Sequence, residues 1–422
     1  MNVKNKFTRN SAIYLLGNAL SSAIPLLLLP ILTRVLTPAD YGIVAMFSLV
    51  MSVASALIGF SVHGAVSIRY FQLKKKEMAS YVGSCIEILV VSTGLVLLIS
   101  IIFGDDLSTI SGVPKEWIWI AIGVASLQFL SNILLALWQV TGESIKYASY
   151  QVGQSFLNAI ISIVLVVLLN MAWEGRVLGQ SLVVAIFGFM AIFFLVRDGQ
   201  VAIPINWKSD VIDALRYGIP LIPHAIGGVA MVMGDRFIIE SQLGESDVGI
   251  YMAAIQISLG LNLVYDSFFK SWHPKIMKLT AISVGFEERS ALVFQAYKLI
   301  GICFCVMLIY LLLVWSIYPY IVGKDFQDGR GLIIFMSIAS FFSSCYYATA
   351  IFISVANRNE LLAINTFVSG SVGLVASYFL CIFYGLTGVA VGLLIGQLLS
   401  FLMCWFSGNL VYPLPWFKKV LK

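Results

Sequence analysis

The sequence predicts an all-α polytopic membrane protein, and three observations lead to this prediction. Of its 422 residues, 60% are hydrophobic and only 11% are charged, whereas a soluble domain carries roughly 25% charged residues. The mean hydropathy is +0.95, which means more apolar surface than a water-soluble fold of this length could cover. The apolar residues form continuous runs about 20 residues long, as in membrane helices, whereas the strands of a membrane barrel alternate over about 10 residues.

We expect twelve membrane-spanning helices joined by short loops, which leave no room for a large domain outside the membrane. The expected spans are 11–36, 41–67, 80–103, 117–139, 149–170, 177–197, 214–240, 248–269, 291–318, 331–355, 361–384 and 386–410. The loop at 197–213 joins six spans to six spans. We therefore predict an N-terminal six-helix lobe at residues 1–205 and a C-terminal six-helix lobe at residues 206–422.

The loop charges predict how these spans are oriented. Most Lys and Arg residues outside the spans fall in loops on one side, including the run Lys74-Lys75-Lys76, and the loops on the other side are more acidic. By the positive-inside rule, the basic side and both termini are cytoplasmic. An even number of spans also requires both termini on the same side, so the two arguments agree.

Two stretches of the chain have a similar form. In residues 25–42, a Pro-interrupted apolar run ends in a charged residue and is closed by a short turn that contains Pro38, Asp40 and Gly42. Residues 220–251 follow the same order, with Asp235-Arg236 at the end of the run. We interpret them as a weak parallel repeat, which indicates two halves built alike. Arg34 and Asp40 flank the first turn and can lock it.

The sequence gives no sign of a metal site, a cofactor or a catalytic nucleophile. The three His residues are not clustered, and a structural metal site needs several ligands close together. The six Cys residues all fall inside apolar runs and none forms a CxxC motif, so we expect them to be buried apolar residues.

Charged residues inside or at the ends of spans are the candidate functional residues, because an ionisable group in the membrane is costly. The candidate phosphate-binding cations are Arg34, Arg69, Arg216, Arg236 and Lys298. Arginine suits bidentate contact with phosphate oxygens. Arg69 and Arg216, at cytoplasmic ends of spans, can meet an incoming anionic group or extend to the membrane interface.

The candidate coupling groups are acids and one histidine, namely Glu87, His224, Asp235 and Asp266. Glu87 either faces a cavity or pairs with a cation on a neighbouring helix. His224 and Asp235 lie about three turns apart, within roughly 20° of one helix face. Asp266 and Lys270 are four residues apart, so we expect a local ion pair there. We hypothesise that a proton or Na⁺ bound at one of these acids biases the return of an empty carrier.

The segment Arg34-x-Leu36-Thr37-Pro38-x-Asp40-Tyr41-Gly42 carries a family resemblance, together with the span count, the two halves and the short loops. These features resemble the polysaccharide-transport branch of the multidrug/oligosaccharidyl-lipid/polysaccharide exporter superfamily, and within it a Wzx-type O-antigen flippase. The matching features of the second half are Asp235-Arg236 and the segment 248–251.

The resemblance implies two six-helix lobes around a central cavity, in the inner membrane of a bacterium. It implies that the protein flips undecaprenyl-pyrophosphate-linked oligosaccharide from the cytoplasmic to the periplasmic leaflet, as in lipopolysaccharide biosynthesis, without being an enzyme. Membrane lipid and other polysaccharide-assembly membrane proteins are the further expected partners, and no nucleic-acid partner is expected.

Two alternatives stay open. A cation-coupled drug exporter of the same superfamily shares the fold but would favour an acidic cavity, whereas cations are at least as prominent as acids in these spans. A membrane polysaccharide polymerase or ligase usually carries a large periplasmic loop, and no such loop is predicted here.

Overall fold

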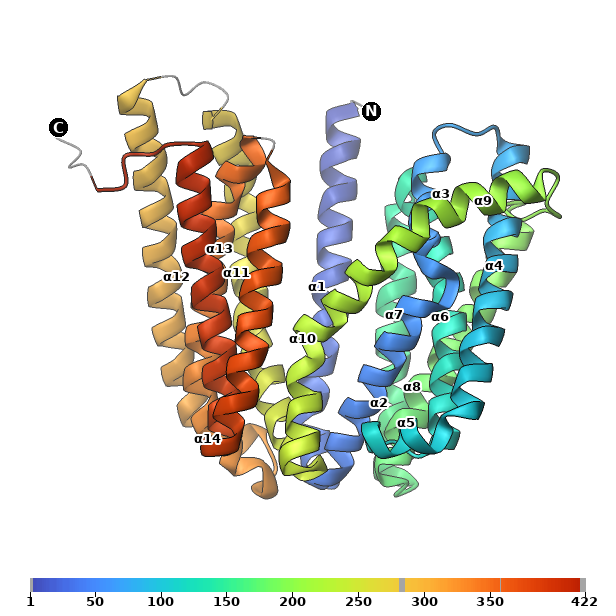
Figure 1. The fold of residues 1–422 in the computed structure, drawn as a ribbon, viewed down its shortest axis with the longest axis horizontal. Helices are drawn as coiled ribbons and strands as arrows, with labels where there is room; N and C mark the ends of the chain where they lie inside the picture. The colour runs from blue at the N-terminus through green and yellow to red at the C-terminus, as the bar shows by residue number, and fades with distance from the viewer. Residues whose placement is uncertain (1–2, 281–284, 357, 418–422) are drawn as a thin grey trace. The chain divides into compact units, whose positions relative to one another are not determined.

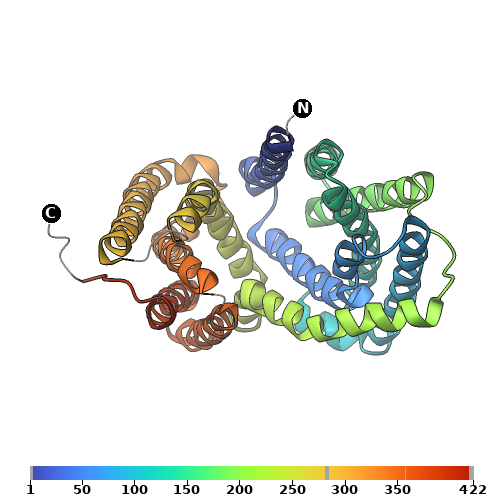
Figure 2. The same cartoon turned by 90° about the horizontal axis from the view of Figure 1, so that it is seen from above.

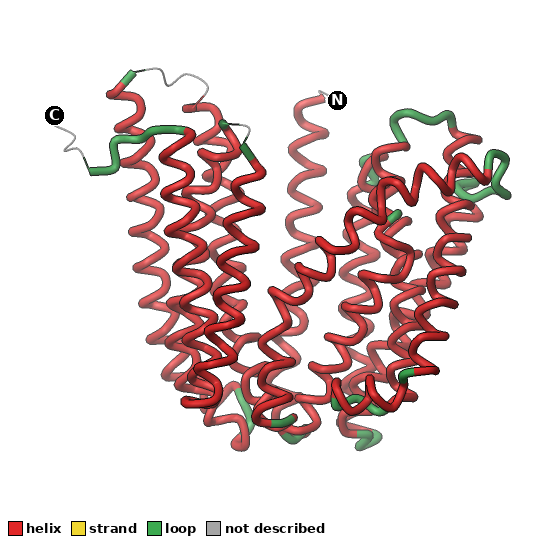
Figure 3. The backbone as a smooth tube through the Cα atoms, viewed as in Figure 1, coloured by secondary structure: helices red, strands yellow, loops and turns green. Residues whose placement is uncertain are grey.

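The protein is helical throughout the part of the chain that its computed structural model describes, residues 3–280, 285–356 and 358–417 (Figure 1). Within these residues eleven helical segments are long and apolar enough to cross a membrane. Figure 3 shows that the loops are short and join the ends of the helices, and no strand occurs in these ranges. The predicted all-α polytopic membrane fold is therefore confirmed.

The chain divides into two compact units, Met1–Ser241 and Gln242–Lys422. The helices of unit 1 are α1 (Val3–Val35), α2 (Pro38–Leu57), α3 (His63–Arg69), α4 (Lys75–Ile102), α5 (Gly104–Ser111), α6 (Lys115–Thr141), α7 (Ser144–Ile163), α8 (Ala172–Arg197), α9 (Trp207–Gly218) and α10 (Ile222–Leu243), whose last two residues belong to unit 2. Short 3-10 segments at Ile58–Ser61 and Ile219–Leu221 and a π-helical segment at Val164–Leu168 connect some of them.

The described residues of unit 2 form four long helices. They are α11 (Glu245–Thr280), α12 (Phe286–Ile321), α13 (Leu332–Val355) and α14 (Asn359–Val411). A 3-10 segment, Lys324–Gly331, precedes α13. α13 packs against α11, α12 and α14.

The last two predicted spans, 361–384 and 386–410, correspond to the two arms of α14. Gly385 takes φ 55° and ψ −138°, a conformation that only glycine adopts readily, so the chain changes direction there. The two arms then pack together: a Cβ on Gly373 would lie 3.0 Å from Cα of Gly396, and a Cβ on Gly392 would lie 2.2 Å from Oγ of Ser377. The missing side chains allow this close packing, as in other membrane helix pairs.

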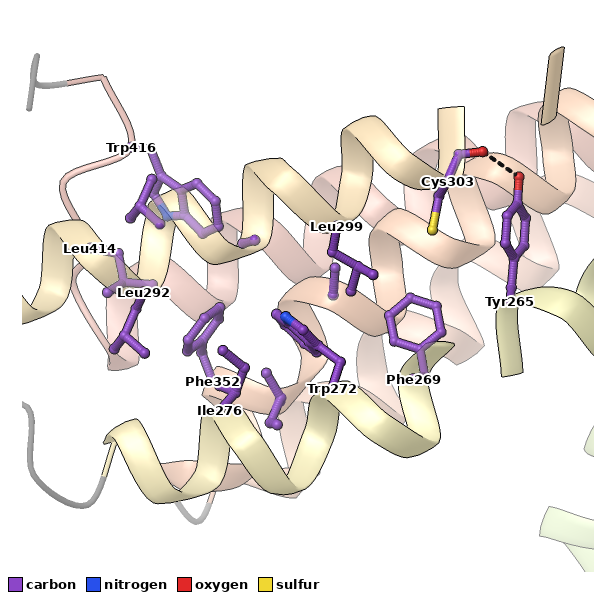
Figure 4. Close-up of a cluster of buried hydrophobic side chains, with 14 of the residues drawn as sticks. Tyr265, Phe269, Trp272, Ile276, Leu292, Leu299, Cys303, Phe352, Leu414 and Trp416 are labelled. Carbon is purple, nitrogen blue, oxygen red and sulfur yellow. Dashed lines mark hydrogen bonds between the residues drawn. The ribbon is translucent and has the colours of Figure 1, made fainter. Parts of the chain in front are cut away.

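A cluster of buried side chains holds unit 2 together where α11, α12 and α13 meet the segment after α14 (Figure 4). Phe269 and Trp272 on α11 and Phe352 on α13 are its large aromatic members. The hydroxyl of Tyr265 donates a 2.9 Å hydrogen bond to the carbonyl of Cys303 on α12. Within a membrane such contacts act mainly through dispersion and buried hydrogen bonds, because lipid tails are as apolar as the side chains.

The boundary between the compact units differs from the boundary predicted at 205/206. α9 and nearly all of α10 belong to unit 1, and α9 contacts both α3 and α4. Figure 2 shows α9 and α10 following each other along unit 1. The reason is a set of polar contacts between α9 and α4, described below. The division into six helices per lobe stays a prediction.

Candidate functional site

Two of the five predicted cations come together around one carboxylate. Arg69, at the end of α3, donates from Nε and Nη2 to the two carboxylate oxygens of Asp213 on α9, at 2.8 and 2.6 Å. Arg216, on the same helix as Asp213, interacts electrostatically with this carboxylate. Hydrogen bonding to Asp213 also raises the pKa of Arg69 above its ordinary value. The positive charge of Arg69 is therefore compensated within unit 1.

Further hydrogen bonds extend this contact, which we call the Arg69 junction, onto α4. The hydroxyl of Tyr81 donates to Asp213 at 3.0 Å. Ser80 donates to Asp210 on α9 at 3.2 Å and accepts a 2.9 Å hydrogen bond from the backbone N–H of Ile205. These contacts explain why α9 is part of unit 1.

Two helix breaks lie against each other beside the junction. In the break after α2, Gly59 and Phe60 take left-handed conformations, with φ 67° and 46°. A Cβ on Gly218, at the end of α9, would lie 2.0 Å from the carbonyl oxygen of Phe60, so only glycine allows this approach. His63 follows the first break, and its ring packs edge-on against Phe129, with 5.6 Å between the ring centroids.

The other predicted cations have three different surroundings. The side chain of Arg34 is exposed and donates to the carbonyl of Pro30 on its own helix, α1. Arg236 is buried on α10, and its backbone N–H donates to the Asp235 carboxylate at 2.9 Å. Lys298 is exposed on α12 in unit 2. Their role in binding phosphate stays a prediction.

Of the predicted coupling groups, Glu87, His224 and Asp266 are exposed, and Asp235 is buried. The ion pair expected between Asp266 and Lys270 is absent from the contacts of the described residues. Both side chains are exposed, and an exposed ion pair contributes little to stability. In the described ranges no group of three or more His, Cys, Asp or Glu residues could hold a metal ion.

The predicted turn after the first span is the start of α2. Thr37 is its N-cap and Pro38 its first residue. The Asp40 carboxylate accepts hydrogen bonds from the backbone N–H and the hydroxyl of Thr37, at 3.0 and 2.7 Å, and the Asp40 N–H donates back to the Thr37 hydroxyl at 3.2 Å. This reciprocal capping box satisfies two of the otherwise unbonded N–H groups at the helix start, those of Thr37 and Asp40. Arg34 takes no part in these hydrogen bonds.

An arginine that sequence reasoning missed occupies a different polar cluster in unit 1. Nη1 of Arg176 on α8 donates to Oδ1 of Asn158 and to Oγ of Ser162, both on α7 and both at 2.8 Å. Ser162 also donates to Asn158 at 3.1 Å. The buried Tyr41 of α2 interacts electrostatically with Arg176. We call Arg176, Asn158, Ser162 and Tyr41 the Arg176 cluster.

The Arg176 cluster contains no carboxylate. Among the described residues no acidic group forms an ion pair or an electrostatic interaction with Arg176. The nearest acid in sequence, Glu174, is exposed and has no ion pair there. Arg176 itself is half-buried. Neutral groups therefore hold its charge in place without compensating it.

The close contact of α7 with α8 positions this arginine. Gly175 and Gly179 flank Arg176 in the segment Gly-Arg-Val-Leu-Gly, a small-xxx-small pattern of membrane helix pairs. A Cβ on Gly179 would lie 3.1 Å from Oγ of Ser162, and a Cβ on Gly175 would lie 3.0 Å from the carbonyl carbon of Leu165. The two glycines thus allow α8 to approach α7 closely enough for Arg176 to reach Asn158 and Ser162.

A row of amide side chains continues from the Arg176 cluster. Gln154 lies one turn from Asn158 on α7 and donates to Gln128 on α6 at 3.2 Å, and Gln128 donates to Asn132 at 3.2 Å. All of these side chains are half-buried. The amides and the Arg176 cluster together form a polar row that joins α6, α7 and α8 inside unit 1.

The sequence contains a signal for the position of Arg176. The predicted sixth span, 177–197, leaves Arg176 in a loop, whereas α8 begins at Ala172. The flanking glycines and the polar face formed by Gln154, Asn158 and Ser162 point to a tight, polar helix pair. Together they could have placed this arginine in the sixth predicted helix rather than in a loop.

Comparison with known proteins identifies the family. The sequence model of a family described as polysaccharide biosynthesis protein matches residues 7–280. Lsg locus putative protein 1 of Haemophilus influenzae strain Rd is 24% identical over 367 residues, which cover 85% of this chain and 87% of the relative. An uncharacterized membrane protein of the same organism is 25% identical over 285 residues, covering 66% of this chain and 68% of the relative.

Solved structures share the fold. The inward closed conformation of the Lipid II flippase MurJ matches with a TM-score of 0.73 and 13% identity over 94% of this chain and 87% of that chain. The inward-facing conformation of a multidrug resistance MATE family transporter of the MOP superfamily matches with a TM-score of 0.70 and 16% identity, over 94% of both chains. The resemblance recognised in the sequence is thereby confirmed. The protein belongs to the polysaccharide biosynthesis protein family and has the fold of the multidrug/oligosaccharidyl-lipid/polysaccharide exporter superfamily.

Proposed function

We propose that the protein flips undecaprenyl-pyrophosphate-linked oligosaccharide units from the cytoplasmic to the periplasmic leaflet of a bacterial inner membrane, by alternating access. The family is one of polysaccharide biosynthesis, and one protein with the same fold is named a Lipid II flippase. Both point to a lipid-linked glycan as the transported molecule. On this proposal the protein is a transporter, and O-antigen units are the favoured substrate.

The observation that carries this proposal is the polar row inside unit 1. The head of a glycolipid cannot cross hydrocarbon unaided, because each polar group without a partner costs several kcal/mol. A flippase must therefore offer hydroxyl, amide and cationic groups at membrane depth. The polar row supplies amides at Gln128 and Gln154 and a cation at Arg176, on three neighbouring helices.

The main rival function is drug export coupled to a cation. A site for cationic drugs would favour carboxylates, whereas the polar row consists of amides, hydroxyls and an arginine. The chemistry of the row therefore favours an anionic, hydroxyl-rich substrate. The second rival, a polysaccharide polymerase or ligase, would need a large loop outside the membrane, and the described loops are short (Figure 3).

The predicted cations retain a place in this proposal. We propose that Arg34, Arg216, Arg236 and Lys298 include groups that meet the pyrophosphate, and that Arg69 can join them only when the Arg69 junction opens. Moving negative charge out of a cell that is negative inside is favoured by roughly 2.3 kcal/mol per charge per 100 mV. The empty protein must then return to its starting conformation. We propose that a proton or Na⁺ assists this return by binding at one of the acids Glu87, Asp235 and Asp266, together with the ring of His224.

The test is reconstitution in liposomes with a fluorescent undecaprenyl-pyrophosphate oligosaccharide in one leaflet. The proposal predicts that the protein brings the label to the opposite leaflet much faster than it moves in protein-free liposomes. A matched preparation with a fluorescent cationic drug tests the rival. Transport of the drug with no movement of the glycolipid would contradict the proposal and favour a drug exporter.

The predicted orientation has a separate test. A reporter that is active only in the periplasm should work when it is fused within 104–116 or 319–330, and should be silent when it is fused at 74–76 or after Lys422. The opposite pattern would place both termini outside and reverse the direction proposed for transport.

A further inference from the structure

We infer that Arg176 is the core of an anion-binding subsite for an acidic group, a carboxylate or a phosphate, on the molecule that this protein transports. This inference deepens the proposed function and rests on it for the identity of the ligand. The anion can come from an acidic sugar in the glycan or from the pyrophosphate of the lipid carrier. Both present the same paired oxygens to a guanidinium.

The first argument is charge. The structure compensates Arg69, which is bonded to Asp213, but gives Arg176 only neutral partners. A half-buried charge in a membrane helix is costly unless something offsets it. Asn158, Ser162 and Tyr41 fix the guanidinium, and an anionic ligand is what would offset its charge.

The second argument is hydrogen-bond geometry. A guanidinium has five N–H donors in a rigid fork. Both protein hydrogen bonds of Arg176 leave from Nη1. Nε and Nη2 make no hydrogen bond to the described part of the chain, and the side chain is only half-buried. The Nε–Nη2 edge is the edge that Arg69 uses to bind both oxygens of Asp213. In Arg176 the same Nε–Nη2 edge is therefore available to bind a ligand.

The third argument is preorganisation. Gly175 and Gly179 allow tight packing of α8 on α7, and the α7 segment that follows Ser162 is π-helical, a form often found at functional sites. Asn170 and Ala172, at the turn into α8, take left-handed conformations with φ 52° and 46°. Such strained backbone persists only where the surrounding structure holds it. The arginine is thus positioned before a ligand arrives.

The experiment measures anion binding by the full-length protein in detergent, by calorimetric titration with inorganic pyrophosphate and with digalacturonate. Arg176→Gln keeps a hydrogen-bond donor for Asn158 but removes the charge. Arg176→Lys keeps the charge but loses the bidentate edge. Arg197→Gln, at the other end of the same helix, is the matched control, because Arg197 is exposed and already pairs with Asp198.

We expect the wild type and Arg197→Gln to bind at least one probe. Arg176→Gln should bind that probe about tenfold or more weakly, and the affinity of Arg176→Lys should lie between those of the wild type and Arg176→Gln. Loss for digalacturonate alone would assign the subsite to the glycan. Loss for pyrophosphate alone would assign it to the carrier. Absence of binding in the wild type, or equal binding in the wild type and Arg176→Gln, would overturn the inference.

A folding defect would be recognised by a changed elution profile or melting temperature. In that case Asn158→Asp provides the second variant, because it places a carboxylate beside Arg176 and should compete with either probe. Unchanged probe affinity in Asn158→Asp would then overturn the inference. Binding in detergent does not depend on translocation, so its outcome is separate from the flipping assay. A protein that binds anions at Arg176 but flips no glycolipid would retain the subsite and lose the proposed function.

Discussion

Two arginines in unit 1 show how the same side chain can be placed for different purposes. Arg69 meets Asp213 through two oxygens and shares that carboxylate with Tyr81, so it joins α3, α4 and α9 (Figure 1). Among the described residues, Arg176 donates hydrogen bonds only to Asn158 and Ser162, both from one nitrogen. An arginine that is paired with an acidic residue connects the helices that carry the two side chains. Neutral partners orient an arginine and leave its charge available for a ligand.

The two arginines also differ in how far away along the chain their partners lie. Arg69 and Asp213 are 144 residues apart, and their pairing holds α9 in unit 1. Arg176 finds its partners on the preceding helix, 14 and 18 residues away. One contact therefore fixes how distant segments assemble, whereas the other depends on a single tight helix pair.

The largest effect should follow from giving Arg176 the kind of partner that Arg69 has. Asn158→Asp places a carboxylate 2.8 Å from Nη1 if the side chain keeps its position. The new ion pair should lower the flipping rate of an anionic glycolipid by about tenfold or more, corresponding to at least about 1.4 kcal/mol, and should not lower the melting temperature. Liposome flipping and thermal unfolding measure the two effects.

The matched control is Gln151→Glu, which adds the same charge two turns away on α7 at a half-buried residue outside the polar row. If both variants lose transport equally, added negative charge alone would explain the loss, and the special role of Arg176 would be rejected.

The next effect concerns the Arg69 junction. Asp213→Asn removes the charge that compensates Arg69 but retains a hydrogen-bonding side chain. Because these side chains are 32% and 37% exposed, we expect a loss of about 1–2 kcal/mol in stability. A double-mutant cycle with Arg69→Gln measures the coupling. If the two single changes add fully, Arg69 and Asp213 contribute independently and the junction does not act as a connection.

A smaller effect should come from the glycine that brings α8 to α7. Gly179→Ala places a methyl group 3.1 Å from Oγ and 3.2 Å from Cα of Ser162, and the resulting strain should cost about 1–2 kcal/mol. Gly123→Ala on α6 meets no atom within 4 Å and should be neutral or stabilising by up to about 1 kcal/mol. Melting temperatures of the two variants provide the comparison, and an equal shift would argue against close helix packing at Gly179.

The smallest effect is expected at a third arginine. Arg197 is exposed at the end of α8, pairs with the adjacent Asp198 and lies over the ring of Phe194. Arg197→Gln should change stability by less than about 0.5 kcal/mol and leave flipping unchanged. A large loss of transport in this variant would mean that any positive charge on α8 matters, and it would weaken the distinction drawn for Arg176.

Much of the fold follows from hydropathy, because apolar runs of sufficient length must become membrane helices. The sequence predicted even the division of α14 at Gly385, where glycine interrupts an apolar run. It did not predict that α9 and α10 belong to unit 1, since no local pattern records a contact such as that of Arg69 with Asp213. It also misplaced Arg176, because a charge near the end of an apolar run shifts the predicted boundary inward.

The candidate site was therefore harder to predict than the fold. By charge alone Arg69 and Arg176 are similar residues, and only their three-dimensional partners distinguish them. Sequence reasoning chose Arg69 because it lies at the cytoplasmic end of the second predicted span, and it left Arg176 in a loop just outside the sixth predicted span, 177–197. The partner of each arginine, rather than its hydropathic surroundings, is what indicates its role.

The most direct test of the central claim is an experimental structure of the protein with a bound acidic lipid-linked oligosaccharide. We expect a carboxylate or phosphate of that molecule to lie about 2.7–2.9 Å from Nε or Nη2 of Arg176, with Nη1 still bonded to Asn158 and Ser162. A structure in which the ligand is bound but all of its anionic groups lie away from Arg176 would contradict the account.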